Sequence, residues 1–145
     1  TKQMLDSSKI VIDVILAGND AIALGVMKAL KERGLEGKVA LAGQDADLPN
    51  IQQIIKGNQT MTVYKPIKTM AFTAAELSML LAKGDQVWQA SATMSNGDRL
   101  VPSYLVDAMA VNEHNIQMTV VAEGYQEEKE IVIRTLTSMK RMHFC

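Results

Sequence analysis

The chain has 145 residues, of which 48% are hydrophobic and 21% are charged, and it carries a net charge of -1 at pH 7. This length and composition predict a single globular domain. The charges nearly balance and aromatic residues make up only 4% of the chain, so the sequence lacks both the basic surface and the stacking platforms that nucleic-acid binding requires.

The first predicted elements are a strand and a helix. Residues 10–17, IVIDVILA, are aliphatic apart from Asp13, a pattern typical of a strand that is buried on both faces of a parallel sheet. A helix is predicted to follow, with Asp20 as its N-cap and Gly34 as its C-terminal stop. Together they make the first half of a βαβ unit.

The same alternation repeats along residues 38–65. A second strand is predicted at 38–43 and a third at 60–65, and between them lies a short helix with Pro49 in its first turn and Gly57 at its end. Strands and helices at this spacing build βαβ units with right-handed crossovers. The sequence therefore predicts an α/β fold in which helices flank a parallel sheet.

The third predicted helix begins after Pro66 and continues to about Lys83. Apolar residues surround it almost completely, and mainly Thr73, Glu76 and Ser78 interrupt them. A helix of this kind is buried on several sides. Three strands and two further helices cannot easily cover it, so we expect another part of the protein or a second chain to pack against it.

Beyond Gly84 the pattern changes to short extended segments. Asn96-Gly97 is the preferred pair for a two-residue hairpin turn, and residues 101–111 and 116–124 are predicted to be extended as well. The tail from Gln126 onward has apolar residues at roughly helical spacing, but its many charges give no firm prediction of its structure.

Three polar residues stand at the predicted carboxyl ends of the three strands. Asn19 follows the first strand, Asp45 follows the second, and Lys65 ends the third, where Pro66 keeps its backbone extended. Ligands of open parallel sheets bind just beyond this edge. A carboxylate accepts hydrogen bonds from hydroxyl groups, an ammonium group donates them and an amide does both, so this set fits a small polyol.

Other roles for these and neighbouring residues stay open. Asp20 fits a helix cap better than a ligand contact, and Asp47 and Asn50 are interpreted as loop and cap residues. Taken alone, Lys65 fits a solvated lysine at a strand end and Asn19 fits a turn residue. The coincidence of three polar groups at one edge is what favours a binding site.

Several segments resemble the periplasmic sugar-binding proteins of the ribose-binding fold, namely GNDAIALGVMKALKERGL, VALAGQDADL and QTMTVYKPI. GQDADL and TVYKPI are similar to the D-xylose-binding branch, and NGDRLVPSYLVDAMAV and VVAEGY fit the closing strands of the family. The resemblance covers about residues 10–125 in the right order. It implies part of the C-terminal lobe of a type I periplasmic binding protein, in which Asn19, Asp45 and Lys65 contact sugar hydroxyl groups.

The resemblance also implies four parts in the chain. Residues 1–65 are expected to form a partial sugar-binding lobe, residues 66–90 a hinge and a helix that crosses to the other lobe, and residues 91–125 a return hairpin with closing strands. Residues 126–145 are a tail of uncertain structure. The first lobe of the family, with the aromatic ring that stacks on the sugar, is absent, and Trp88 is interpreted as a packing residue instead.

The predicted function is reversible capture of a monosaccharide, D-xylose or a related pentose, by the solute receptor of an ABC sugar transporter, with lobe closure about Lys65-Pro66. The expected partners are the sugar, the missing N-terminal lobe or another chain, and a transporter permease or membrane sensor; neither a cofactor nor nucleic acid is expected. The family implies a periplasmic or other extracytoplasmic location, although the chain opens without the apolar core of a signal peptide. The single cysteine, Cys145, excludes a disulfide within the chain.

Three alternatives accompany this prediction. An enzyme is disfavoured, because the sequence lacks a G-x-S-x-G turn and a phosphate loop, and His114 and His143 have no metal-binding partner at a suitable spacing. A sugar-sensing domain that signals to a membrane sensor kinase or a regulator would use the same lobe. An isolated lobe would be inactive without its complement, because its apolar helix and incomplete sheet lack cover.

Overall fold

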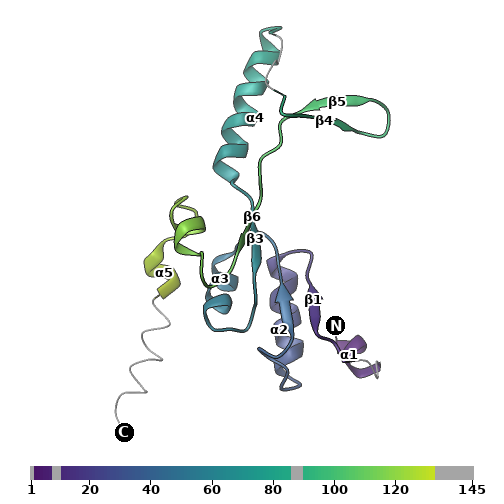
Figure 1. Cartoon of the computed structure of the whole chain (residues 1–145), viewed down its shortest axis with the longest axis vertical. Coiled ribbons are helices and arrows are strands. Elements are labelled where there is room, and N and C mark those ends of the chain that lie inside the picture. Colours follow the sequence, from purple (N-terminus) through teal and green to yellow (C-terminus); the bar gives the residue numbers. More distant parts are fainter. Residues whose placement is uncertain (1, 8–10, 86–89, 133–145) are drawn as a thin grey trace. The chain divides into compact units, whose positions relative to one another are not determined.

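The structure is a computed structural model that describes residues 2–7, 11–85 and 90–132 (Figure 1). It divides into two compact units. The first unit comprises the chain up to Tyr64 together with the chain from Met109, and the second comprises Lys65–Ala108. Tyr64 and Met109 face each other on paired strands, so the chain leaves the first unit and returns to it at one place.

Short strands form the centre of the first unit. They are β1 (Val14–Leu16), β2 (Ala40–Ala42), β3 (Thr62–Tyr64) and β6 (Met109–Val111). β1 pairs with β2 in parallel, and β3 pairs with β6 antiparallel. A parallel bridge between Ala42 and Met61 connects β2 to the start of β3. The first three strands thus run in parallel, as the sequence predicts.

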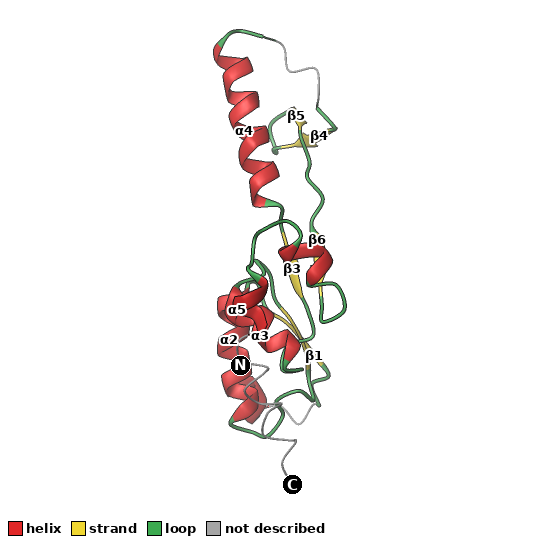
Figure 2. Cartoon of the chain, turned by 90° about the vertical axis from the view of Figure 1, so that its left-hand side faces the viewer, coloured by secondary structure: helices red, strands yellow, loops and turns green. Residues whose placement is uncertain are grey.

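The first unit contains five helices among the described residues. They are α1 (Lys2–Ser7), α2 (Asp20–Lys31), α3 (Leu48–Ile55), a π-helix (Gln117–Val121) and α5 (Glu128–Val132). α2 connects β1 to β2, α3 connects β2 to β3, and these two connecting helices are the ones that the sequence predicts. The two helices contact each other and lie beside the strands (Figure 2).

The apolar residues of this unit form two buried clusters. In the first, α2 packs one face against Val39 and Leu41, and that face is formed by Ala23, Val26, Met27 and Leu30. Residues at this spacing share one side of a helix, which explains why the segment folds as an amphipathic helix. The second cluster joins α3, β3, β6, the π-helix and α5 through Ile51, Ile54, Tyr64, Val111, Ile116, Val120 and Ile131, with Ala46 beside them.

The C-terminal end of α2 lies where the sequence predicts it, whereas the N-cap lies one residue earlier than predicted. Asn19, not Asp20, caps the helix, because its side-chain oxygen accepts the N–H of Ile22 at 2.9 Å. Asn and Asp have nearly equal preferences for this position, so adjacent candidates cannot be ranked from the sequence. At the C-terminal end Gly34 has a φ of +64° and donates to the carbonyl of Lys31 at 3.1 Å, which confirms the predicted stop.

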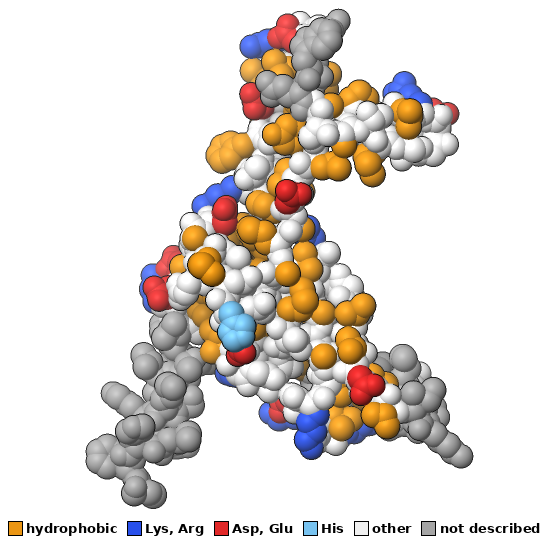
Figure 3. All heavy atoms as spheres, viewed as in Figure 1, with side chains coloured by type: hydrophobic (Ala, Val, Ile, Leu, Met, Phe, Trp, Pro, Cys, Tyr) orange, Lys and Arg blue, Asp and Glu red, His pale blue; other side chains and the backbone are white. Residues whose placement is uncertain are grey.

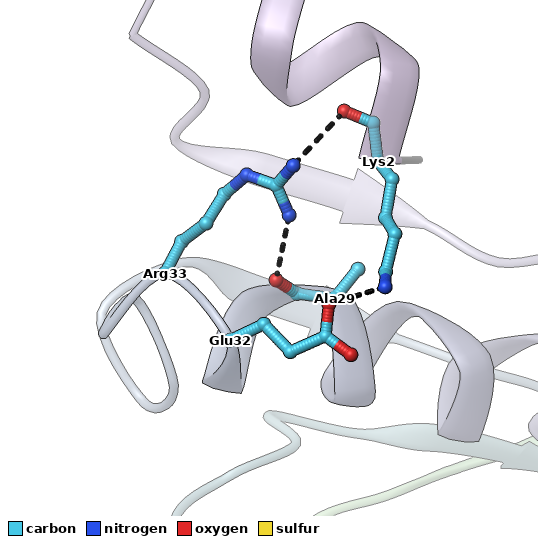
Figure 4. Close-up of polar contacts among 4 residues, drawn as sticks. All are labelled: Lys2, Ala29, Glu32 and Arg33. Atoms are coloured by element: carbon cyan, nitrogen blue, oxygen red, sulfur yellow. Dashed lines mark hydrogen bonds and ion pairs between the residues drawn. The ribbon is translucent and has the colours of Figure 1, made fainter.

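α1 is attached to the last turn of α2 (Figure 4). The Arg33 guanidinium donates to the carbonyl oxygens of Lys2 at 3.4 Å and of Ala29 at 3.3 Å. The Lys2 ammonium pairs with Glu32, and this contact lowers the pKa of the Glu32 carboxyl. These side chains are largely in solvent, so the contacts orient α1 more than they stabilise the fold.

β1 differs from its prediction because one of its faces is open. The sequence predicts a strand buried on both faces, but Val14 is 57% and Leu16 is 80% exposed. Ile15, which points the other way, packs on the α2 cluster. Within the described part of the chain β1 pairs with β2 alone and is therefore an edge strand, and its face with Val14 and Leu16 is exposed.

The segment 116–124 is helical at Gln117–Val121 and not extended as predicted. Its β-branched residues have a local preference for strands. Ile116 and Val120 lie one helical turn apart and both enter the second buried cluster. Packing against this core overrides the local preference, since a helical backbone brings these two side chains close together on one face, whereas a strand would hold them several residues apart along its length.

The second unit contains α4 (Ile67–Ala82), β4 (Ala92–Ser95) and β5 (Leu100–Ser103). Although α4 is largely apolar, none of its residues is buried, and the side chain of Phe72 is 76% exposed. Figure 3 shows hydrophobic side chains on the surface of α4 and of the β4–β5 hairpin. None of the described helices combines the length and the apolar character that crossing a membrane requires.

The β4–β5 hairpin is confirmed, but its turn lies one residue later than predicted. Asn96 donates its N–H to the carbonyl of Arg99 at 3.2 Å, so Gly97 and Asp98 are the central residues, and Gly97 has a φ of +94°. The Asn96 side-chain oxygen accepts the N–H groups of Asp98 at 3.0 Å and Arg99 at 2.9 Å. An Asn that bonds to the backbone ahead of it favours the first position of a turn over a central one.

Candidate functional site

The loops that follow β1 and β2 lie side by side at the carboxyl ends of these strands. Asp20, directly after Asn19, donates its N–H to the carbonyl of Gln44 at 2.7 Å. The next residue, Asp45, donates its N–H to the carbonyl of Val63 in β3 at 2.8 Å. The loop that carries Asp45 is therefore bonded to the loop that carries Asn19 and to β3. This is the edge at which ligands of parallel sheets bind.

Asn19 caps α2, and this cap uses only one of the two polar atoms of its side-chain amide. Its side chain is half-buried at the N-terminus of α2, and the Oδ1 atom accepts the N–H of Ile22. The Nδ2 group takes no part in this cap. Because the cap fixes the rotamer of the amide, Nδ2 is held as a directed hydrogen-bond donor.

Asp45 and Ala46 have backbone conformations that residues other than glycine rarely adopt, with φ values of +105° and +55°. Such conformations cost about 1–3 kcal/mol each and persist only where the surroundings hold them. The Ala46 N–H donates to the Thr62 hydroxyl at 3.3 Å. The Tyr125 hydroxyl donates to the Asp45 carbonyl at 3.2 Å, and the Gln126 amide donates to the next carbonyl at 2.9 Å. Strain of this kind concentrates at functional sites, which supports a role for this turn.

Asp20 is fully buried beneath the two loops. Its carboxylate accepts hydrogen bonds from the Asp47 N–H at 2.9 Å, the Gln59 amide at 3.1 Å and the Thr62 hydroxyl at 2.9 Å. Burial raises the pKa of Asp20 above its ordinary value of 3.8, and the three hydrogen bonds oppose this shift. Asp20 therefore supports the loops from inside, where it ties α2 to the second loop and to β3.

Gly43 makes room for the buried carboxylate. A Cβ atom at this position would lie 2.0 Å from the Asp20 Oδ1 atom and 3.0 Å from the Gln59 Nε2 atom. Any other residue would force the carboxylate or the backbone to move. The glycine that opens the GQDAD segment is thus required by the close approach of Asp20.

Asn50 belongs to the same buried group. The sequence suggested a loop or helix-cap role for this residue, but its side chain caps no helix. Its Nδ2 group donates to the carbonyl of Asp20 at 3.0 Å and to the Gln59 Oε1 atom at 2.9 Å. Asp47 is the N-cap residue of α3, but its side chain makes no capping hydrogen bond. The buried hydrogen bonds of Asn50 therefore fix the loop from within, and the start of α3 is favoured by Pro49 in its first turn and not by a side-chain cap.

Lys65 is the first residue of the second unit, whereas Asn19 and Asp45 belong to the first. Directly before it, Tyr64 ends β3 with a side chain that is 1% exposed, and its ring lies 4.9 Å from the ring of Tyr125. The backbone that leads to Lys65 is thus anchored in the second buried cluster. The convergence of Lys65 with the other two residues stays a prediction.

The other polar candidates that the structure describes do not form a second site. His114 is exposed, and its Nε2 atom lies 3.5 Å from the carboxylate of Glu113. In the portion of the chain that the structure covers, no group of three or more His, Cys, Asp or Glu residues is placed to hold a metal ion. Trp88, His143 and Cys145, on which the sequence analysis commented, lie outside the described residues.

Residues 1–86 match the model of a family described as a periplasmic binding protein domain. The chain belongs to the periplasmic binding protein family. The matched range contains both loops of the candidate site and the strand that ends at Tyr64.

Two curated periplasmic binding proteins are similar to most of the chain. The D-xylose-binding periplasmic protein of Haemophilus influenzae is 46% identical over 127 residues, which cover 88% of this chain and 38% of the relative. The D-xylose-binding periplasmic protein of Escherichia coli is 48% identical over 120 residues, which cover 83% of this chain and 36% of the relative. The chain thus spans little more than a third of the length of these relatives.

A solved carbohydrate transporter solute binding protein confirms the predicted fold class. The carbohydrate transporter solute binding protein from Chloroflexus aurantiacus, in complex with D-glucose, superposes with a TM-score of 0.78 at 27% identity. The match covers 89% of this chain and 38% of that chain. The parallel strands with flanking helices are therefore an incomplete lobe of the type I fold, with the hairpin added.

The sequence did not predict the buried polar group around Asp20. It also did not predict that Tyr125 and Gln126 bond to the carbonyls of the turn at Asp45. One available signal was Thr62, a polar residue in the middle of a predicted strand and on the same face as the buried Tyr64. A buried hydroxyl needs a partner, and that requirement pointed to an acid or amide nearby. For Tyr125 and Gln126 no local signal exists, since both lie 80 residues from the turn they hold.

Proposed function

We propose that this periplasmic binding protein domain is part of a receptor that binds D-xylose or a related pentose for an ABC sugar transporter in the periplasm. The observation that carries the proposal is the hydrogen-bonded adjacency of the loops after β1 and β2, which hold Asn19 and Asp45. The names of the two relatives support the choice of sugar. Capture is non-covalent and uses neither a cofactor nor a metal.

Each of the three polar residues has a distinct role in this proposal. The Asp45 carboxylate accepts hydrogen bonds from sugar hydroxyl groups, the Lys65 ammonium donates to hydroxyl oxygens, and the Asn19 amide donates through Nδ2. A sugar that lacks one of these hydroxyl groups leaves a polar side chain unpaired in the closed site. This mismatch is the basis for selectivity among monosaccharides.

In this proposal the second unit packs against the lobe of the receptor that lies outside the matched region. An apolar groove of about 420 Å³ lies on this unit, lined by Met70, Thr73, Ala74, Leu77, Tyr104, Leu105 and Val106. The relatives carry more than half of their length outside the matched region, which supplies a lobe large enough to cover it. Closure of the two lobes about the segment at Lys65-Pro66 then encloses the sugar, and the closed form engages the permease or a membrane sensor.

Isothermal titration calorimetry tests this proposal on the completed protein, by which we mean this chain joined to the lobe that its relatives carry beyond the matched region. The panel is xylose, ribose, arabinose, galactose and glucose. We expect xylose or another pentose to bind with the lowest Kd, and the chain without the added lobe to bind far more weakly because it lacks enclosure. No heat of binding with any sugar would refute the proposal.

A further inference from the structure

The segment at Tyr125 and Gln126, 80 residues further along the chain, donates hydrogen bonds to the two carbonyl groups of the turn at Asp45 and Ala46. The Tyr125 hydroxyl donates to the Asp45 carbonyl at 3.2 Å, and the Gln126 Nε2 group donates to the Ala46 carbonyl at 2.9 Å. The N–H groups of the same turn are bonded to β3. The N–H and the carbonyl of both residues of this strained turn are therefore fixed by partners that lie outside the turn.

Tyr125 is itself held firmly. Behind the π-helix Gly124 has a φ of +62°, and the N–H groups of Tyr125 and Gln126 both donate to the carbonyl of Val120, at 2.9 Å and 3.0 Å. The ring of Tyr125 packs on the buried ring of Tyr64, with centroids 4.9 Å apart and planes inclined by 37°. The hydroxyl is thus presented to the turn by a rigid support.

The Tyr125 hydroxyl also keeps its proton. Burial raises the pKa of Tyr125 above its ordinary value of 10, and the nearby charges of Asp47 and Asp45 raise it further. A protonated phenol is a hydrogen-bond donor, which is what the Asp45 carbonyl requires. Burial and the nearby carboxylates therefore both favour the protonated form of the phenol that donates to the Asp45 carbonyl.

We propose that Tyr125 and Gln126 are positioning residues, which hold the Asp45–Ala46 turn in the strained conformation that presents the Asp45 carboxylate to the sugar. The inference rests on the proposed function and adds two residues to the same site. Neither residue has to touch the sugar. Without the two hydrogen bonds, the turn is free to relax toward conformations that residues other than glycine prefer, and the carboxylate moves with it.

Calorimetry with D-xylose on the completed protein tests this role through Tyr125→Phe and Gln126→Leu. The first change removes a hydroxyl and keeps the ring packed on Tyr64. Each variant is expected to raise the Kd about 3- to 10-fold, which corresponds to the loss of one hydrogen bond. Gln52→Leu is the matched control, because Gln52 donates a similar amide bond to the carbonyl of Glu130 at 2.9 Å in the same unit, and its Kd is expected to equal that of the wild type.

A double-mutant cycle separates positioning from general stability. In an Asp45→Ala background no carboxylate is left to orient, so Tyr125→Phe is expected to have no further effect on the Kd. As a second readout, the three-bond HN–Hα couplings of Asp45 and Ala46, which report φ, are expected to change in sugar-free Tyr125→Phe. Unchanged couplings, or the same loss of affinity with and without the Asp45 carboxylate, overturn the inference.

The outcomes also distinguish this inference from the proposed function. If the wild-type completed protein binds no sugar, the proposed function fails. If the wild type binds xylose and both Tyr125→Phe and Gln126→Leu bind it equally well, the function stands and the positioning role is wrong.

Discussion

The first unit buries its apolar side chains in two clusters, whereas α4 of the second unit buries none of its residues. Asn19 and Asp45 stand on loops that the first unit holds with its own core and its own buried polar group. The α4 surface, in contrast, offers a groove and exposed apolar side chains that the described residues of its unit leave uncovered. The edge that we propose as the sugar site is thus held within one unit, whereas for the second unit we propose cover by another lobe.

The largest expected effect of a single change lies in the core of the first unit. Ile51 is fully buried, and Ile51→Ala is expected to lower the free energy of unfolding by about 2–5 kcal/mol, because it removes packed methylene groups and leaves a cavity. Ile22→Ala is the control, since Ile22 is 55% exposed on α2. Urea denaturation followed by circular dichroism measures both. Equal losses in the two variants would contradict the core assignment.

Gly43→Ala tests the close approach beneath the candidate site. The added methyl group would collide with the Asp20 carboxylate, and we expect a loss of about 1–3 kcal/mol in the free energy of unfolding. Gly25→Ala is the matched change, because a Cβ there meets nothing within 4 Å and alanine favours the interior of α2. Gly25→Ala should be neutral or stabilising, and a Gly43→Ala protein as stable as the wild type would show that the carboxylate is not fixed there.

The buried carboxyl group makes the stability of the first unit depend on pH. Because the pKa of Asp20 is raised above 3.8 in the folded state, folding favours its protonated form. The contribution of Asp20 is therefore fully present below pH 3.8 and is lost as the pH rises through the higher pKa of the folded state. We expect the free energy of unfolding of the wild type, relative to Asp20→Asn, to fall as the pH rises through this window. A constant difference in a urea series at several pH values would contradict the raised pKa.

The smallest expected effect is on α4. Phe72→Ala changes a side chain that is 76% exposed, so in the chain alone we expect the free energy of unfolding to stay within about 0.5 kcal/mol of the wild type. In the completed protein the same change should cost more, because we propose that the other lobe covers the helix there. Identical small effects in both proteins would mean that α4 has no apolar partner.

Elements with strong local signals could be predicted from the sequence. Gly34 ends α2 in a left-handed conformation, and Pro49 stands in the first turn of α3, as their stereochemistry requires. The alternation of strands and helices was sufficient to predict the parallel arrangement and the edge at which Asn19 and Asp45 stand. These features depend on neighbours in sequence, so a single sequence carries them.

The rest depends on contacts between distant residues. Asp20 is bonded to Gln59 and Thr62, which lie 39 and 42 residues away, and no local pattern distinguishes such an aspartate from a helix cap. The helix at 117–121 forms because its residues meet a core built by other elements. The positive φ of Asp45 has the same origin, since the residues that hold it come from β3 and from the segment behind the π-helix.

Titration of the completed protein with D-xylose, comparing the wild type with Asp45→Ala, tests the central claim most directly. Removing the carboxylate leaves sugar hydroxyl groups without an acceptor, and the account predicts a loss of about 1–3 kcal/mol, or roughly 5- to 150-fold in Kd. Asp13→Ala, an exposed aspartate that precedes β1 and lies away from its carboxyl end, is expected to bind like the wild type. An Asp45→Ala protein whose Kd matches that of Asp13→Ala would contradict the assignment of this edge as the sugar site.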